Sequence, residues 1–159
     1  GEYYQRMLME VDEALKNYQE EFPVLKGMKP EWGGFIWFQG WNDMFNQDAL
    51  AQYEENLVHL IKDLRTSLNQ PNLPVVVGEL GNMGEDAGTN MKLIREAQRK
   101  ACQRKEWKGS VSFVKTTNFA RPKEESPNVG HGHHWFGNAE SYFLIGDALG
   151  KEMVRLLQK

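Results

Sequence analysis

Three short apolar runs, separated by longer stretches with helical periodicity, constrain the fold of this chain most. The runs span residues 34–40, 74–80 and 110–114, and each is nearly continuous, as in strands that are buried on both faces of a parallel sheet. Apolar residues spaced three and four apart predict helices over residues 2–19, 48–69, about 89–105 and 139–157. We therefore predict an α/β fold with three layers, in which helices lie on both faces of a parallel sheet. Asp48 is the expected N-cap of the second helix.

Composition narrows the class of protein. The 159 residues are 40% apolar and 26% charged, which is typical of one globular domain. The formal net charge of −3 argues against a nucleic-acid partner. No apolar run approaches the roughly 20 residues that a membrane-spanning helix needs, so no membrane association is expected. The single cysteine, Cys102, cannot form an internal disulfide.

The connections that follow the three runs are the expected location of a site. Right-handed crossovers place the carboxyl ends of parallel strands at one edge of the sheet, and ligands bind at that edge. The connections are residues 39–43, 78–82 and 118–137, and they contain three of the four histidines together with several Gly and Asn residues.

The first connection, Gln39-Gly-Trp-Asn-Asp43, combines a flexible backbone with an amide side chain. Gly40 permits close approach of the backbone to a ligand. The Asn42 amide can donate a hydrogen bond to a developing oxyanion. An ordinary turn at the end of a strand contains the same residue types, so that interpretation stays open.

The last connection holds His131, His133 and His134. Histidine is the usual general base near neutral pH. Three histidines can also hold zinc, but these are packed into four positions, which is too tight for all three to converge easily on one ion. A surface loop with incidental histidines is the third interpretation, and Asn138 has the character of a helix N-cap.

Glu79 lies at the end of the second predicted strand, inside an otherwise apolar segment, where a carboxylate requires a partner or a function. The candidate partners are the histidines of the last connection and Arg121. A structural ion pair is an equally good interpretation of this residue.

With these segments placed, the chain resembles the SGNH (GDSL-like) hydrolases. Within them it is similar to the sialic acid-specific 9-O-acetylesterase-like and carbohydrate esterase family 6 acetylxylan-esterase-like branch. Residues 34–43 resemble the WxQG segment of that branch, and Gly40-Trp-Asn-Asp43 also fits the G-x-N-D block of SGNH enzymes. Residues 73–81 and 130–142 resemble the later strand and the histidine block of bacterial members.

The resemblance implies a carbohydrate O-acetylesterase that acts through a serine nucleophile and a histidine base, on an acetylated carbohydrate and without a cofactor or metal. It implies catalytic roles for His134 as the base and for Asn42 and Gly40 at the oxyanion hole. His133 and then His131 are the alternatives for the base. The residues expected to bind the substrate are Gln39, Trp41, Glu79, His133 and Trp135, with Phe136 as a further aromatic at the rim.

Two features depart from the family pattern. None of the five serines lies in a G-D-S or G-Q-S context. The usual D-x-x-H spacing places His131 where an acid should precede His134, so Glu124, Glu125 or Glu79 would substitute, or the histidine works without an acid. We therefore expect residues 1–159 to form one partial SGNH hydrolase domain of flavodoxin-like fold that lacks its first strands, with Gly1 at a cut.

Such a partial sheet would expose the edge of residues 34–39, which is an aggregation hazard. We expect that edge to pair with an N-terminal companion chain, a symmetry-related copy or a swapped segment. Similarity to polysaccharide-degrading enzymes suggests a secreted or periplasmic location. The alternative function is a non-catalytic carbohydrate-binding or scaffold module of the same fold.

Overall fold

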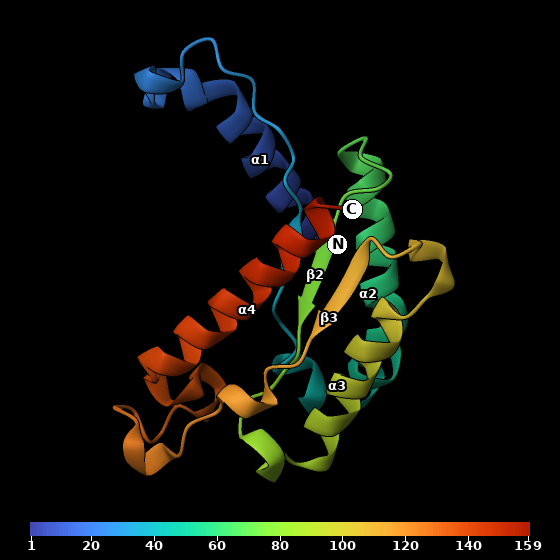
Figure 1. Ribbon diagram of the computed structural model, residues 1–159. Helices are drawn as coiled ribbons and strands as arrows, with labels where there is room; N and C mark the ends of the chain where they lie inside the picture. The colour runs from blue at the N-terminus through green and yellow to red at the C-terminus, as the bar shows by residue number, and fades with distance from the viewer. The chain divides into compact units, whose positions relative to one another are not determined.

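The computed structural model describes residues 1–159 as two compact units, residues 1–32 and residues 33–159 (Figure 1). The first unit consists of α1 (Glu2–Glu21) and a short 3₁₀ turn, Pro23–Leu25. Its helix ends next to Pro23, because a residue that precedes proline is displaced from helical geometry. The Gln19 side chain accepts a hydrogen bond from the Gly27 N–H at 3.1 Å and so ties the following link to the helix. The expectation of one domain over residues 1–159 stays a prediction.

The second unit contains a parallel sheet of three strands in the order β1-β2-β3. The strands are β1 (Phe35–Trp37), β2 (Val75–Gly78) and β3 (Val111–Val114), and Ile36, Val76 and Ser112 lie in register across them. This confirms the predicted α/β class with a parallel sheet. β1 is shorter than the apolar run of residues 34–40, whose two end residues, Gly34 and Gly40, adopt φ values of 153° and 150° and lie outside the strand.

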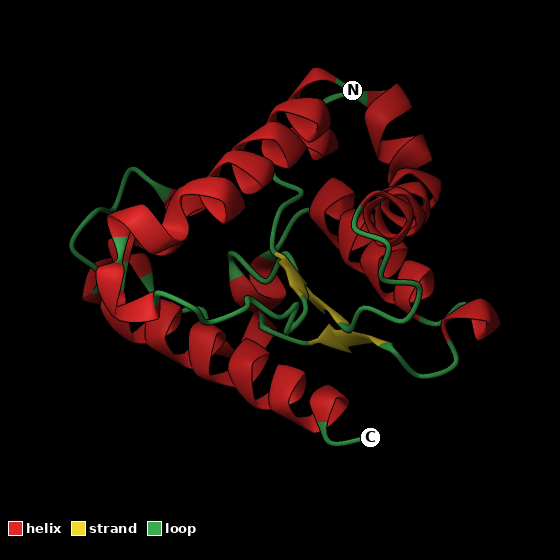
Figure 2. Cartoon of the chain, turned by 90° about the horizontal axis from the view of Figure 1, so that it is seen from above, coloured by secondary structure: helices red, strands yellow, loops and turns green.

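Helices lie on both faces of this sheet (Figure 2). On one face, α2 (Gln47–Ser67) and α3 (Thr89–Cys102) pack on Val75 and Val77. On the other face, α4 (Ala139–Leu157) packs on Val76. The three valines are fully buried, and their alternation follows from the period of two in a strand.

Two of the helix ends that differ from the sequence prediction are explained by individual contacts. The N-cap of α2 is Asn46 rather than Asp48, because the Asn46 side chain accepts hydrogen bonds from the N–H groups of Asp48 and Ala49 at 2.9 and 3.0 Å. Helix α3 ends at Cys102, three residues early, because Lys105–Trp107 form a separate 3₁₀ turn. The buried Trp107 indole donates to the Ala101 carbonyl at 2.6 Å and fixes that turn on the helix.

The segments that follow the three strands gather at one end of the sheet. Figure 1 shows this for the teal, light green and orange connections, which follow β1, β2 and β3 in turn. The edge that the sequence indicated is therefore where these loops meet. No helix in the structure is both long and apolar enough to cross a membrane.

Candidate active site

A cavity of about 470 Å³ lies where the three connections meet. Most of the residues singled out in the sequence line it, together with others that were not. The lining comprises Phe38, Gln39, Gly40, Trp41, Asn42, Leu80, Asn82, His133, His134, Trp135 and Tyr142. The structure thus brings Asn42 and two of the three clustered histidines to one cavity, while Glu79 and His131 are not part of its lining.

Close packing of neighbouring side chains requires glycine at position 40. A Cβ there would lie 2.9 Å from the Ile94 side chain and 3.2 Å from the Tyr53 hydroxyl, and its φ of 150° disfavours any other residue. Beside it, the Gln39 amide donates to the Asp43 carboxylate at 2.6 Å. The turn that contains Asn42 is therefore held by packing at Gly40 and by the hydrogen bond between Gln39 and Asp43.

A buried polar network lies behind this turn. The Gln39 carbonyl accepts from the Tyr53 hydroxyl at 2.7 Å and from the Gln98 amide at 2.9 Å. The Gln98 carbonyl oxygen in turn accepts the Leu80 N–H at 2.9 Å. Burial raises the pKa of Tyr53 to about 12, so its phenol stays protonated and donates. This network ties the ends of β1 and β2 together.

Sequence reasoning missed this network. Gln98 is fully buried, and the only signal was an amide on the apolar face of α3, one helical turn beyond Ile94. A polar residue on the buried face of a helix indicates that it has a hydrogen-bond partner, but the sequence does not show which residue that is.

The histidines are presented by an unusual backbone. We name residues 128–137 the histidine loop. Trp135 and Phe136 are left-handed, with φ values of 52° and 53°, and both are buried. Trp135 stacks on Phe38, with 6.2 Å between the ring centroids. Left-handed aromatic residues cost free energy and persist where surrounding contacts hold them, so these two side chains anchor the loop.

The three imidazoles of this loop pack against one another rather than around a common point. The ring centroids of His133 and His134 lie 4.3 Å apart, and those of His131 and His133 lie 5.2 Å apart in a stacked arrangement. No group of three His, Cys, Asp or Glu side chains in the structure is placed to hold a metal ion.

His133 also packs on Trp41, with 5.7 Å between the centroids. Desolvation lowers the pKa of His133 below its ordinary value of 6.5, and the neighbouring His134 and His131 lower it further. Its neutral form therefore predominates near neutral pH, and that form can accept a proton.

Glu79 has none of the partners that the sequence suggested. Its carboxylate is buried and accepts hydrogen bonds from the N–H groups of Thr116 and Thr117 at 2.8 Å and from the Thr117 hydroxyl at 2.6 Å. Arg121 pairs instead with Glu140 at 2.8 Å. Glu79 thus joins the ends of β2 and β3, and the expected contact with the histidines or with Arg121 was wrong.

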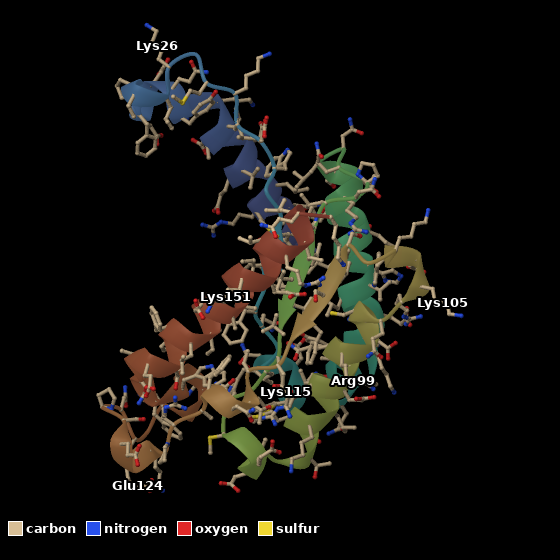
Figure 3. The ribbon with its side chains drawn as sticks, viewed as in Figure 1. Lys26, Arg99, Lys105, Lys115, Glu124 and Lys151 are labelled. Carbon is tan, nitrogen blue, oxygen red and sulfur yellow. The ribbon has the colours of Figure 1, made fainter.

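Glu124, another expected partner of the histidine, projects from the outer tip of its connection (Figure 3). It is exposed and its nearest charged partner is Lys123, at 3.8 Å. No hydrogen bond links it to a histidine in the structure.

None of the five serines lines the cavity. Ser110 and Ser141 bond to main-chain carbonyls of Trp107 and Phe119 at 2.6 and 2.7 Å. The others lie on α2, on β3 and in the connection before the histidine loop.

Comparison with known proteins identifies the family of the chain. The sequence profile of the family described as carbohydrate esterase, sialic acid-specific acetylesterase, matches residues 1–155. A probable carbohydrate esterase of Arabidopsis thaliana is 30% identical over 95 residues, which are 60% of this chain and 31% of that protein. The matched part therefore spans about a third of the length of this curated relative. No solved structure matches the chain. The chain belongs to the sialic acid-specific acetylesterase family of carbohydrate esterases.

Proposed function

We propose that this chain is the C-terminal part of a carbohydrate O-acetylesterase whose nucleophilic serine lies on another segment. One observation carries the proposal: a single cavity is lined by the Asn42 turn and by two histidines, and by no serine of this chain. The cavity has a candidate base and a candidate oxyanion donor, which are two of the three groups that acyl transfer by a serine requires.

In the proposed mechanism, a serine hydroxyl attacks the carbonyl carbon of a sugar acetyl ester while His134 takes its proton. The carbonyl oxygen gains negative charge and is stabilised by the Asn42 amide and the backbone at Gly40. The ester C–O bond then breaks, and His134 returns the proton to the sugar oxygen. Water then attacks the carbonyl carbon of the acetyl-serine while His134 takes its proton. Acetate is released, and His134 returns that proton to the serine oxygen.

The walls of the cavity support a sugar as the substrate. Trp41 and Trp135 offer aromatic surface, and the exposed Gln39 and His133 offer hydrogen-bonding groups. Aromatic rings combined with a few polar groups are typical of small-molecule sites. Glu79, whose three hydrogen bonds keep it in the interior, has an indirect role in this proposal, because it holds the strand ends that frame the cavity.

The second candidate is a non-catalytic carbohydrate-binding or scaffold module. The same observation favours it, because a cavity without a nucleophile can bind a sugar and leave it intact. The two candidates differ in whether a companion segment completes the site.

Hydrolysis of p-nitrophenyl acetate distinguishes the two candidates. The chain is assayed alone and with the polypeptide encoded directly upstream in its gene. We expect activity only in the combination, a loss of about 10²–10⁴-fold in His134→Ala, and a loss of about 10²–10³-fold in Asn42→Ala. His133→Ala reports whether the neighbouring imidazole is the base instead. Glu124→Gln, at the exposed tip, is the control that should retain activity. Inactivity of the combination would favour the binding module.

A further inference from the structure

We propose that Asn82 is a positioning residue that holds the histidine loop in its active geometry. The inference concerns the loop itself and rests on the proposed function only for its consequence for the reaction rate. The residue lies in the connection after β2, fifty positions from the loop that it contacts.

The contacts of Asn82 are with the main chain beside the histidines. Its side-chain amide donates to the carbonyls of Gly132 and His133, at 3.1 Å each. These two peptide groups lie on either side of His133, and the second of them joins His133 to His134. The next carbonyl, that of His134, accepts from the Tyr142 hydroxyl at 3.0 Å. Three consecutive carbonyls of the loop are thus held by side chains from outside it, and Asn82 holds two of them.

Asn82 is also the one place where a buried side-chain atom lacks a hydrogen-bond partner. The residue is 1% exposed, and its Oδ1 has no partner. Folded proteins rarely leave a buried acceptor unpaired, because burial removes its bonds to water. The side chain keeps this orientation because its amide N–H groups satisfy the two loop carbonyls.

The backbone around Asn82 is itself fixed. Arg95 on α3 donates to the carbonyls of Leu80, Asn82 and Gly84 at 2.7, 2.8 and 3.0 Å. Gly81 lies so close to the main chain of Thr116 and Thr117 that a Cβ there would clash with it. Residues 80–84 are therefore held on α3 by hydrogen bonds and close packing. Asn82 connects this fixed segment to the histidine loop through its two side-chain hydrogen bonds.

Hydrogen exchange measured by mass spectrometry on this chain tests the proposal without any need for activity. In Asn82→Ala we expect exchange of residues 131–137 to accelerate at least about tenfold, since fewer contacts then resist local opening. Exchange in β1, β2 and β3 should stay unchanged. Asn82→Leu removes the same donors but nearly keeps the volume, and should reproduce the effect.

Arg65→Met is the matched control. Arg65 also donates from a buried side chain to a main-chain carbonyl, that of Leu73, but before β2 rather than after it. It should leave exchange in residues 131–137 unchanged. The proposal is overturned if the Asn82 variants leave this exchange unchanged, or if the Arg65 variant accelerates it equally.

Titration of the imidazoles by NMR supplies a readout that a general loss of stability does not move. In the parent chain the pKa of His133 is lowered by desolvation and by its two neighbouring rings. In Asn82→Leu we expect it to rise toward its ordinary value, because the rings are no longer held together. An unchanged His133 titration in a folded Asn82→Leu chain would also overturn the proposal.

The consequence for rate separates this inference from the proposed function. In an active combination with the companion, Asn82→Leu should lower kcat about 10- to 100-fold with KM nearly unchanged, since a displacement of about 1 Å in a catalytic group can cost about 100-fold. If no activity is found, the proposed function fails while the exchange result still supports Asn82. If exchange is unchanged, the Asn82 proposal fails whatever the activity.

Discussion

At the scale of single residues, Glu79 and Asn82 stand three positions apart and do different work. Glu79 keeps its carboxylate in the interior and joins two strand ends through Thr116 and Thr117. Asn82 reaches across to the histidine loop. The sequence marked the whole segment as unusual because polar residues follow an apolar run. It could not assign these roles, because the partners lie 37 and 50 positions away.

Glu79→Gln tests the structural role of the buried carboxylate. All three hydrogen bonds end on one carboxylate oxygen, Oε2. Glutamine places there either an NH₂, which cannot accept them, or a neutral carbonyl oxygen, which accepts them more weakly than a charged one. An unsatisfied buried donor costs about 1–3 kcal/mol, and we expect the free energy of unfolding in urea to fall by that amount at pH 7. Glu124→Gln, at an exposed position, should change it by less than about 0.5 kcal/mol. Equal effects in both variants would refute the role.

At the scale of elements, helical periodicity and short apolar runs located every α-helix and strand, while the ends depended on individual contacts. The four predicted helices and three predicted strands all form, because the spacing of apolar residues is a local property of the chain. Their ends differ by a few residues. At α2 the sequence prediction chose Asp48, whereas the structure caps the helix with Asn46, two residues earlier. Sequence preference does not distinguish Asn from Asp at this position.

Asn46→Ala tests the observed cap of α2. Loss of the side chain leaves the N–H groups of Asp48 and Ala49 without their acceptor, and N-cap replacements of this kind cost about 1 kcal/mol. Thermal or urea unfolding followed by circular dichroism should show that loss. Asn46→Asp retains an acceptor and should stay within about 0.5 kcal/mol of the parent. An Asn46→Ala chain as stable as the parent would show that Asn46 does not cap the helix and would favour Asp48 as the N-cap.

At the scale of the whole molecule, the outer edge of β1 is the part of the second unit at which we expect another polypeptide to pair. β1 lies at one end of the strand order. The Phe35 N–H donates to Pro74 at 2.8 Å, toward β2, so the N–H and C=O of Ile36 point outward, because successive residues of a strand alternate. Ile36 is 46% exposed and Phe38 is 36% exposed. We propose that the companion segment pairs with this edge.

Ile36→Pro tests that pairing. Proline removes the outward N–H while the bonds of Phe35 and Trp37 to β2 remain, and edge strands tolerate proline. We expect binding of the companion, measured by calorimetry, to weaken at least about tenfold, which is about 1.4 kcal/mol. The fold of the chain alone, followed by circular dichroism, should be retained. Ile36→Val keeps both the N–H and the apolar side chain and should bind as the parent does. Unchanged binding by Ile36→Pro would exclude this edge as the interface.

The sequence by itself determined the α/β class, the parallel strands and the edge at which Asn42, His133 and His134 meet. These follow from periodicity and from the handedness of crossovers, which are properties of short stretches and of chain direction. Only the tertiary structure decided that Glu79 binds Thr116 and Thr117, that Tyr53 and Gln98 hold the turn before Asn42, and that Asn82 holds the histidine loop. The physical reason is distance along the chain. A buried polar group must find a partner, but which partner it finds depends on how segments tens of residues apart pack together.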